Sequence, residues 1–238
     1  MGLSDTAAGV KRSGNADGFP FAAVIFDMDG VIVDTEWAYV QRNLDFAHDA
    51  GFKLSREESV AQVGQSAQEY RRALVGWFAR SGRPMSEDDA VRVYEEWAGR
   101  HPVEFRALLN PGVVETVAAL REASVRVALA SSSPMANIRE VLAACGLADA
   151  FEVVVSGEQF RESKPNPEIY LHTLGELGLP AGECCCVEDS VPGITAGKRA
   201  GLTVFAKREE RFGFSQDAAD AIIDQVPDLF EAARKLRG

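Results

Sequence analysis

Two aspartates one residue apart, Asp27 and Asp29, are the first residues of the chain whose types and spacing could do chemistry. They follow an apolar run, residues 21–26, which predicts a buried strand of a parallel sheet. Doubly wound sheets place their chemistry just beyond the carboxyl ends of the strands. Gly30 then lets the chain turn away, so that both carboxylates could face one crevice. An isolated pair of this kind could equally cap a turn, so its meaning depends on the rest of the chain.

Hydroxyl and ammonium groups follow later in the chain. A second predicted strand, residues 125–130, runs into a serine triplet that begins with Ser131 and Ser132. Lys164 precedes Pro165, which biases the lysine backbone toward extended conformations and suits a point charge aimed at one phosphate. Serine triplets and loop lysines are common without any function, so these residues alone identify no site.

Two more carboxylates, Glu188 and Asp189, stand directly after the apolar segment 184–187. Mg²⁺ takes few protein ligands, chiefly carboxylates and carbonyls, while substrate phosphate and water complete its octahedron. Asp27, Asp189 and Glu188 are therefore candidate magnesium ligands, provided that the fold brings the strand ends together.

Composition excludes several classes of function. The 238 residues include 36 acids and 25 bases, and a net charge of -11 argues against a basic face for nucleic acid. The sequence has no apolar run as long as a membrane helix. Residues 1–18 lack the apolar stretch of a secretory signal and predict a flexible tail on a cytoplasmic protein. The four cysteines have no CxxC spacing, so we expect buried thiols in a reducing compartment.

A helical insertion interrupts the α/β pattern. Between residues 36 and 110 the apolar residues recur with the helical period, and Gly51 and Gly82 mark predicted helix ends. Ser86 is a predicted N-cap, and the aromatic residues of this segment predict the core of a small bundle. Alternating helices and strands resume at Pro111.

Taken together, the four polar segments resemble the four motifs of the haloacid dehalogenase-like (HAD) superfamily. The segments are DMDGVIVDT from Asp27, the serines from Ser131, KPNP from Lys164 and VEDSVPG around Asp189. The resemblance covers residues 20 to about 226 and points to the branch of β-phosphoglucomutase-like proteins and sugar phosphatases. It implies a Rossmann-like doubly wound parallel sheet in an α/β core and an inserted α-helical cap. The expected division is a tail at 1–18, a core at 19–35 and 111–238, and a cap at 36–110.

The resemblance also implies a mechanism. Asp27 would attack phosphorus and form an aspartyl phosphate, which splits one difficult displacement into two easier ones. Asp29 would protonate the leaving alkoxide and later deprotonate the hydrolytic water. Ser131, Ser132 and Lys164 would hold the phosphoryl oxygens.

The implied cofactor is Mg²⁺, with Asp27, Asp29, Glu188 and Asp189 as its expected ligands. The expected partner is a small phosphorylated metabolite, with neither nucleic acid nor membrane, and the expected state is a monomer or weak dimer. Thr35 and Gly112 lie in the two linkers that would act as the hinge of the cap.

Other chemistries of the superfamily fit less well. Dehalogenases lack the second acid and phosphonatases usually have alanine there, so Asp29 favours a phosphate ester. A sugar phosphomutase of the β-phosphoglucomutase type is the main alternative. Those mutases carry a histidine in the first cap helix, where this chain has Tyr39, and a basic residue after the cap-loop glycine, where Ala67 follows Gly64. A mutase must bind a second phosphate, so these differences favour water as the acceptor. A non-catalytic binding protein is a further alternative, which the complete motifs oppose.

Overall fold

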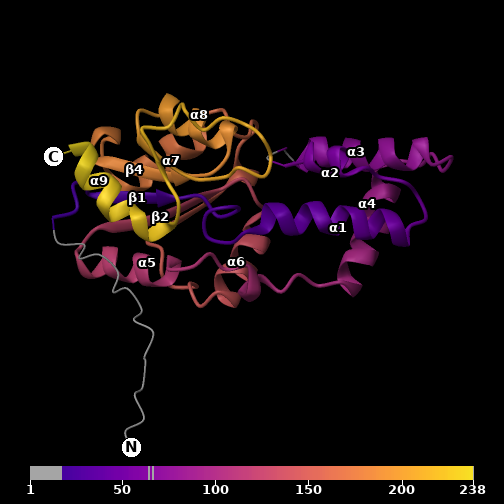
Figure 1. Cartoon of the computed structure of the whole chain (residues 1–238), viewed down its shortest axis with the longest axis horizontal. Helices are drawn as coiled ribbons and strands as arrows, with labels where there is room; N and C mark the ends of the chain where they lie inside the picture. The colour runs from indigo at the N-terminus through magenta and orange to yellow at the C-terminus, as the bar shows by residue number, and fades with distance from the viewer. Residues whose placement is uncertain (1–17, 64, 66, 238) are drawn as a thin grey trace, which may run out of the picture.

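The computed structural model describes residues 18–63, 65 and 67–237. At its centre is a six-stranded sheet with the order β3-β2-β1-β4-β5-β6. The strands are β1 (Ala23–Phe26), β2 (Arg126–Ser131), β3 (Val153–Ser156), β4 (Cys184–Glu188), β5 (Thr203–Lys207) and β6 (Ala221–Ile223). Each neighbouring pair is parallel, and helices cover both faces of the sheet (Figure 1). The predicted α/β class with a doubly wound parallel sheet is therefore confirmed.

The strands are apolar on both faces because each face is covered by helices. β1 is wholly buried, and its side chains divide between two hydrophobic clusters on opposite sides of the sheet. The three adjacent cysteines of β4 alternate in the same way, with Cys185 in one cluster and Cys184 and Cys186 in the other. All four cysteines are free and buried, as predicted.

Two groups of helices pack on the sheet. Leu120, Ile138 and Phe230 belong to the cluster on one face, and Tyr170 and Ile194 to the cluster on the other. The helices on the first face are α5 (Val113–Glu122), α6 (Met135–Ala144) and α9 (Leu229–Arg237), and those on the second are α7 (Glu168–Leu177) and α8 (Val191–Arg199). α9 begins two residues after Pro227, which lies in a 3-10 turn, η4 (Val226–Asp228).

The segment between β1 and α5 is helical, as predicted. It contains α1 (Thr35–Asp49), α2 (Arg56–Val60), α3 (Ala67–Arg80), α4 (Glu87–Arg100) and a short 3-10 helix, η1 (Phe105–Leu108). Its aromatic residues form a hydrophobic cluster of their own around Phe46, Trp77 and Phe78. Ser86 caps α4 by accepting a hydrogen bond from the backbone N–H of Asp89, at 3.2 Å. The prediction of Ser86 as an N-cap and the packing role of the aromatic residues are thus confirmed.

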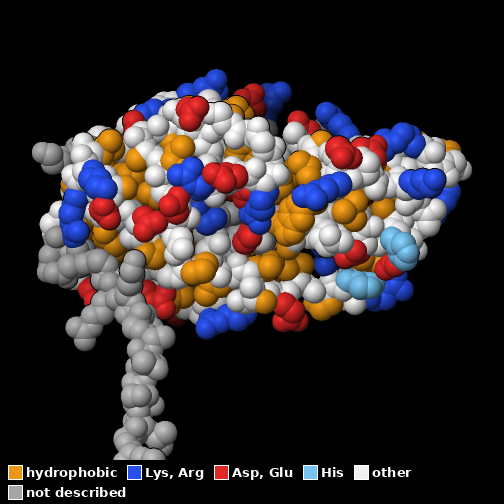
Figure 2. Space-filling model, in the orientation of Figure 1, with side chains coloured by type: hydrophobic (Ala, Val, Ile, Leu, Met, Phe, Trp, Pro, Cys, Tyr) orange, Lys and Arg blue, Asp and Glu red, His pale blue; other side chains and the backbone are white. Residues whose placement is uncertain are grey.

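Charges of both signs are mixed with apolar groups over the face shown in Figure 2. Within the described ranges, every helix is too short or too polar to cross a lipid bilayer. The predicted flexible tail lies outside the described residues, except for Gly18.

Candidate active site

The carboxylates at the carboxyl ends of β1 and β4 meet at one edge of the sheet. These strands are neighbours, with Phe26 opposite Val187, so Asp27 and the Glu188–Asp189 pair leave the sheet side by side. Asp27 is 7% exposed, Glu188 0% and Asp189 3%. One oxygen from each of the three lies within 4.8 Å of the others, a spacing that could hold a metal ion. Two strand ends far apart in the sequence thus form one carboxylate cluster.

Two glycines allow this close approach. A Cβ on Gly30, whose φ is +82°, would lie 1.8 Å from the Asp189 Oδ2 atom. A Cβ on Gly193, in the first turn of α8, would lie 2.0 Å from the Glu188 Oε2 atom. Any larger residue at either position would displace a carboxylate of the cluster.

Lys164 supplies the positive charge next to the cluster. Its Nζ donates to Asp27 Oδ1 and to Glu188 Oε1, both at 2.6 Å, and to the backbone carbonyl of Ala130 at 3.0 Å. The side chain is 6% exposed, so these contacts occur largely away from solvent. The amine therefore links the end of β2 to the carboxylates at the ends of β1 and β4.

Burial raises the pKa of Asp27 to about 8, with Lys164 opposing the rise and Glu188 and Asp29 adding to it. The pKa of Asp189 is also raised well above its usual value, by burial and then by Asp27 and Glu188. Burial alone would lower the pKa of Lys164, but attraction to Asp27 and Glu188 outweighs it, so the amine stays charged. One ammonium leaves the carboxylates short of positive charge, and a divalent cation is the group that would supply it.

Tyr170 is a residue of this site that the sequence analysis missed. It is fully buried on α7, its hydroxyl donates to Glu188 Oε1, and Lys164 Nζ lies 5.1 Å from the centre of its ring. Burial, followed by the charge of Glu188, raises the pKa of the phenol, so it remains a hydrogen-bond donor. Its position six residues after Lys164 gave no sequence signal, because a buried tyrosine in an amphipathic helix is ordinary core.

Replacing Tyr170 with phenylalanine is expected to lower the free energy of unfolding by about 1–2 kcal/mol, because Glu188 loses a buried donor. The ring and its packing are retained, so the change reports the hydroxyl alone. Urea denaturation of the metal-free protein measures the difference. An unchanged midpoint would mean that Glu188 does not depend on this hydrogen bond.

Asp29 lies apart from the carboxylate cluster. Its Oδ1 accepts a hydrogen bond from Thr35 Oγ1 at 2.6 Å, and its Oδ2 accepts one from Ser133 Oγ at 2.8 Å. The structure therefore places the Asp29 carboxylate between the start of α1 and the loop after β2, not among the three grouped carboxylates. Ser133 is another residue that the sequence analysis did not assign to the site, although the serine triplet contains it.

The two predicted phosphate-binding serines differ in their surroundings. Ser131 ends β2, is 1% exposed, and accepts a hydrogen bond from the Ser133 N–H at 3.1 Å. Ser132 is exposed, and its backbone lies so close to Gly157 that a Cβ on that glycine would be 2.9 Å from the Ser132 Cα. Both residues stand at the same sheet edge as the carboxylates, because β2 neighbours β1.

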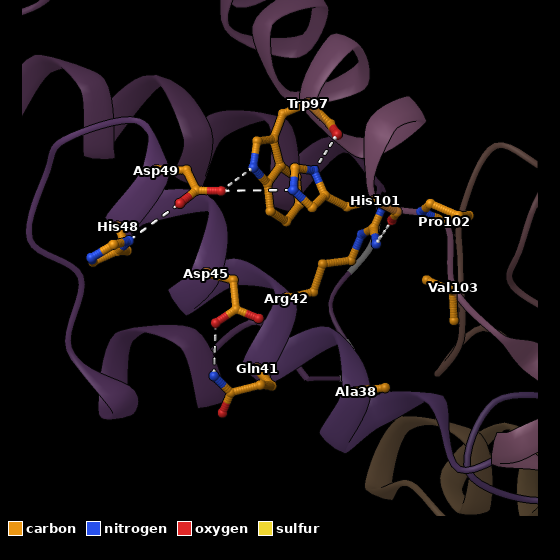
Figure 3. Close-up of a pocket in the computed structure, with 10 residues that line it drawn as sticks. All are labelled: Ala38, Gln41, Arg42, Asp45, His48, Asp49, Trp97, His101, Pro102 and Val103. Atoms are coloured by element: carbon orange, nitrogen blue, oxygen red, sulfur yellow. Dashed lines mark hydrogen bonds and ion pairs between the residues drawn. The ribbon is translucent and has the colours of Figure 1, made fainter.

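A separate pocket of about 560 Å³ lies between α1, the end of α4 and the linker that follows it (Figure 3). Asp49 Oδ2 accepts a hydrogen bond from Trp97 Nε1 at 2.8 Å, and His101 stacks on the Trp97 ring with centroids 4.3 Å apart. Arg42 donates to the carbonyl of Ala98 at 3.0 Å and to that of His101. These contacts join α1 to the end of α4, and the lining includes none of the predicted site residues.

Comparison with known proteins identifies the family. The family model described as haloacid dehalogenase-like hydrolase matches residues 21–201. The chain is 34% identical over 180 residues to hexitol phosphatase B of Escherichia coli, a match covering 75% of this chain and 79% of that protein. It is 33% identical over 192 residues to a phosphorylated carbohydrates phosphatase of Thermotoga maritima, covering 76% and 82% of the two chains.

Solved structures agree at the level of the fold. A β-phosphoglucomutase from Clostridium difficile has a TM-score of 0.74 at 23% identity, covering 91% of this chain and 96% of that one. CbbY from Rhodobacter sphaeroides, in complex with phosphate, has a TM-score of 0.60 at 26% identity, covering 88% and 96%. The family match extends from before Asp27 to beyond Asp189. The chain therefore belongs to the haloacid dehalogenase-like hydrolase family, in the branch that contains sugar phosphatases.

Proposed function

We propose that the protein is a Mg²⁺-dependent phosphatase that hydrolyses a small phosphate monoester, such as a sugar phosphate, through an aspartyl-phosphate intermediate. The observation that carries this proposal is the contact of Lys164 with Asp27 inside a cluster of three buried carboxylates. A nucleophilic carboxylate, a fixed positive charge and a place for a divalent cation are the parts that phosphoryl transfer requires. The names of the relatives, hexitol phosphatase and phosphorylated carbohydrates phosphatase, support a sugar or polyol phosphate as the substrate class.

Asp27 is the proposed nucleophile, and its attack forms an acyl phosphate while the alcohol leaves. Lys164 neutralises Asp27 and an incoming phosphoryl oxygen together, which makes the approach of two anions less unfavourable. Asp27, Glu188 and Asp189 would hold Mg²⁺, which when bound supplies further positive charge to the phosphoryl group. Glu188 Oε1 accepts hydrogen bonds from Lys164 and Tyr170. Glu188 would therefore position the lysine as well as contribute to the metal site.

Asp29 is the proposed proton donor to the leaving group and proton acceptor from the hydrolytic water. Its hydrogen bonds to Thr35 and Ser133 hold the carboxylate beside the sheet edge without giving it a formal positive partner. We propose no metal contact for the Asp29 carboxylate, because it lies outside the group of three carboxylates whose oxygens are within 4.8 Å of one another. Ser131 and Ser132 would bind phosphoryl oxygens at the end of β2, through a hydroxyl and through backbone N–H groups.

We also propose that residues 36–110 form a cap that moves relative to a core of residues 19–35 and 111–238. The two linkers run together as a neck, in which the Asp34 N–H donates to the Leu108 carbonyl at 2.7 Å and Val33 pairs with Leu109. The separate hydrophobic cluster that joins α1, α3 and α4 supports a cap that moves as one body. Thr35 and Gly112 are the proposed hinge residues.

Gly112 is not a suitable site for testing the hinge. Its φ is +75°, and a Cβ there would lie 2.3 Å from the Pro227 Cγ atom. A valine at this position would therefore disturb packing between α5 and η4, and a loss of activity would not report on the cap.

A phosphomutase would need a positively charged group in the cap to bind a second phosphate. Tyr39, at the position of the histidine that such mutases carry, is half-buried, and burial and Asp29 raise its pKa. A neutral phenol cannot act as the positively charged group that a second phosphate would need. Gly64, in the cap loop, lies outside the described residues, as does the side chain of Ala67.

Incubation with hexose 1-phosphates, polyol phosphates and a trace of hexose bisphosphate separates the functions: a phosphatase releases inorganic phosphate, a mutase yields the 6-phosphate isomer, and a binding protein yields neither.

Mg²⁺ is expected to raise the melting temperature of the protein, because an ion that binds only the folded state stabilises it by mass action. At one hundred times the dissociation constant, the gain is about 2.7 kcal/mol. Asp189→Asn is expected to shift the Mg²⁺ titration to higher concentration, whereas Asp149→Asn, an exposed control, should not. An unchanged titration in Asp189→Asn would remove Asp189 from the proposed ligands.

A further inference from the structure

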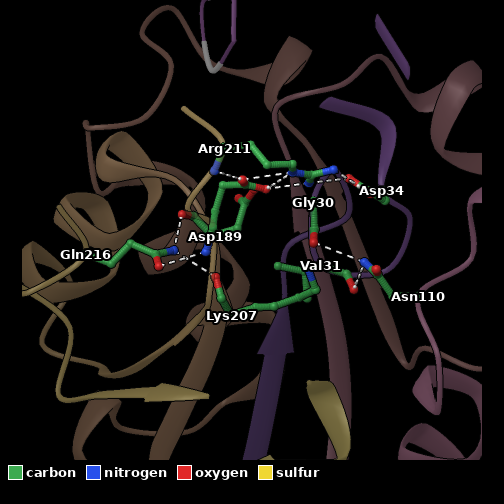
Figure 4. A network of polar contacts seen from close by, with 9 residues as sticks. Gly30, Val31, Asp34, Asn110, Asp189, Lys207, Arg211 and Gln216 are labelled. Carbon is green, nitrogen blue, oxygen red and sulfur yellow. Dashed lines mark hydrogen bonds and ion pairs between the residues drawn. The ribbon is translucent and has the colours of Figure 1, made fainter. Parts of the chain in front are cut away.

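The loop between β5 and β6, residues 208–220, reaches the neck of the cap. Within this loop, Arg211 donates from Nη1 to Asp34 Oδ2 at 2.8 Å and from Nη2 to Asp34 Oδ1 at 2.7 Å (Figure 4). Two parallel N–H···O bonds between a guanidinium and a carboxylate fix orientation as well as distance. The partners are 177 positions apart in the sequence, so this is a tertiary contact that no local pattern suggests.

Asp34 is the N-cap residue of α1, a position at which aspartate normally accepts a hydrogen bond from the first turn of the helix. Among the described residues its side chain makes no such capping bond, because both of its oxygens face Arg211. The sequence therefore places a good capping residue at the start of α1, and the fold uses it to tie the neck to a distant loop.

The loop itself is well anchored. Glu209 is buried and accepts hydrogen bonds from Arg211 Nε at 2.9 Å and from the Arg211 N–H at 2.7 Å, which holds the guanidinium in place. Gln216, also buried, accepts from the Glu209 N–H at 3.0 Å and donates to the carbonyls of Asp189 at 2.5 Å and Lys207 at 2.7 Å (Figure 4). Arg211, which contacts the neck, is thus connected through Glu209 and Gln216 to the backbone carbonyl of Asp189 in the carboxylate cluster.

On the other side of the contact lies the proposed proton donor. Asp34 precedes Thr35, whose hydroxyl donates to Asp29. Asn110, from the second linker, donates to the carbonyls of Gly30 at 3.0 Å and Val31 at 2.9 Å, just after Asp29 (Figure 4). Both linkers of the neck therefore hold the segment that contains Asp29, Thr35 through the Asp29 carboxylate and Asn110 through the backbone that follows it. A contact that fixes the neck should therefore also fix the position of the Asp29 carboxylate.

We propose that Arg211, held by Glu209, is a positioning residue that fixes Asp34 and thereby sets where Thr35 holds Asp29. The inference rests on the proposed function, because it assigns Arg211 an effect on the step that Asp29 performs. Contacts of the Trp37 ring in α1 reinforce the same junction: the ring centroids of Phe212 and Trp37 lie 6.4 Å apart, and the guanidinium of Arg56 in α2 lies 4.6 Å from the Trp37 centroid. Figure 2 shows apolar side chains gathered on the surface over this junction.

The experiment compares two conservative variants with a matched control. Asp34→Asn removes the ionic contact, leaves the Arg211–Glu209 pair intact and keeps a residue suited to the N-cap. Arg211→Lys keeps the charge but loses the two-pronged geometry. Arg208→Lys is the control, because Arg208 lies in the same loop but pairs with Asp224, at 2.6 Å, rather than with the neck.

With a polyol phosphate as the probe, whose alkoxide leaving group needs the proton that Asp29 would supply, Asp34→Asn and Arg211→Lys are each expected to lower kcat about fivefold, the factor that corresponds to about 1 kcal/mol for a partly exposed ion pair. KM should change less than kcat, since Arg211 acts on Asp29 and not on the phosphate. The double variant should lose no more than either single variant, because both changes remove the same contact. Values of kcat equal to that of Arg208→Lys, or additive losses in the double variant, would overturn the inference.

Hydrogen exchange gives a readout that does not depend on turnover. The Asp34 amide, which donates to the Leu108 carbonyl, is expected to exchange several-fold faster in both variants and at the wild-type rate in Arg208→Lys. Unchanged exchange in Asp34→Asn and Arg211→Lys would overturn the inference even if the enzyme is a phosphatase. If the wild type hydrolyses no phosphate ester, the proposed function fails, and the exchange rates alone then decide whether Arg211 fixes the neck.

Discussion

Replacing Asp27 with alanine is expected to abolish the hydrolysis of phosphate esters while leaving the protein folded. Asp27 is the proposed nucleophile, and Lys164 contacts its Oδ1 at 2.6 Å. Without the Asp27 carboxylate no aspartyl phosphate can form, so the substitution removes the covalent route altogether. Removing the nucleophile of a covalent enzyme typically lowers kcat by roughly ten-thousand-fold or more. The measurement is the release of inorganic phosphate by wild-type and variant protein at saturating Mg²⁺.

The fold should survive this change because Asp27 stands at the rim of the sheet and contributes no apolar packing. Lys164 keeps its contacts with Glu188 and with the Ala130 carbonyl, so its ammonium remains paired. Far-UV circular dichroism and the melting temperature of the metal-free protein provide the structural control. Asp27→Asn, which keeps the shape of the side chain, should be equally inactive. Substantial Mg²⁺-dependent hydrolysis by both variants would contradict the assignment of Asp27 as the nucleophile.

Replacing Lys164 with methionine is expected to remove activity and also to destabilise the protein. Activity falls because no fixed positive charge then faces the phosphoryl group, a loss of about a hundredfold or more in kcat. Stability falls because Asp27 and Glu188, both buried, lose the ammonium that they share. Breaking a buried ion pair by removing one partner typically costs about 3 kcal/mol or more.

The matched control is Lys198→Met, which removes a lysine paired with Asp220 at 2.6 Å on a half-exposed site of α8. A surface pair of this kind contributes less than about 1 kcal/mol, and solvent screens it further. Urea denaturation in the presence of a metal chelator compares the two variants, and phosphate release compares their activity. Equal destabilisation by both changes would mean that Lys164 has no special role in holding the carboxylates together.

Local patterns in the sequence determined the elements of this protein. The apolar run before Asp27 predicted β1, and Ser86 predicted the start of α4, because a strand or a helix end is specified by residues within a few positions of one another. The order of apolar strands and helices likewise determined the parallel sheet and its helical insertion. The same reasoning led to Asp27 and Asp189, since parallel strands bring the residues at their carboxyl ends to one edge. Lys164 was predicted instead from its place before Pro165 and from the resemblance of KPNP to a family motif.

Only the tertiary structure decided which of these groups touch. Ser133 and Asp29 are 104 residues apart, and Arg211 and Asp34 are 177 apart, so no periodic pattern relates their positions. Tyr170 looked like ordinary core, although its hydroxyl bonds to Glu188. A hydrogen bond depends on distances of a few tenths of an ångström, which are set by how whole elements pack and not by the residues beside each partner. The sequence could therefore determine which side chains reach the edge of the sheet, whereas packing decided which of them bond to one another.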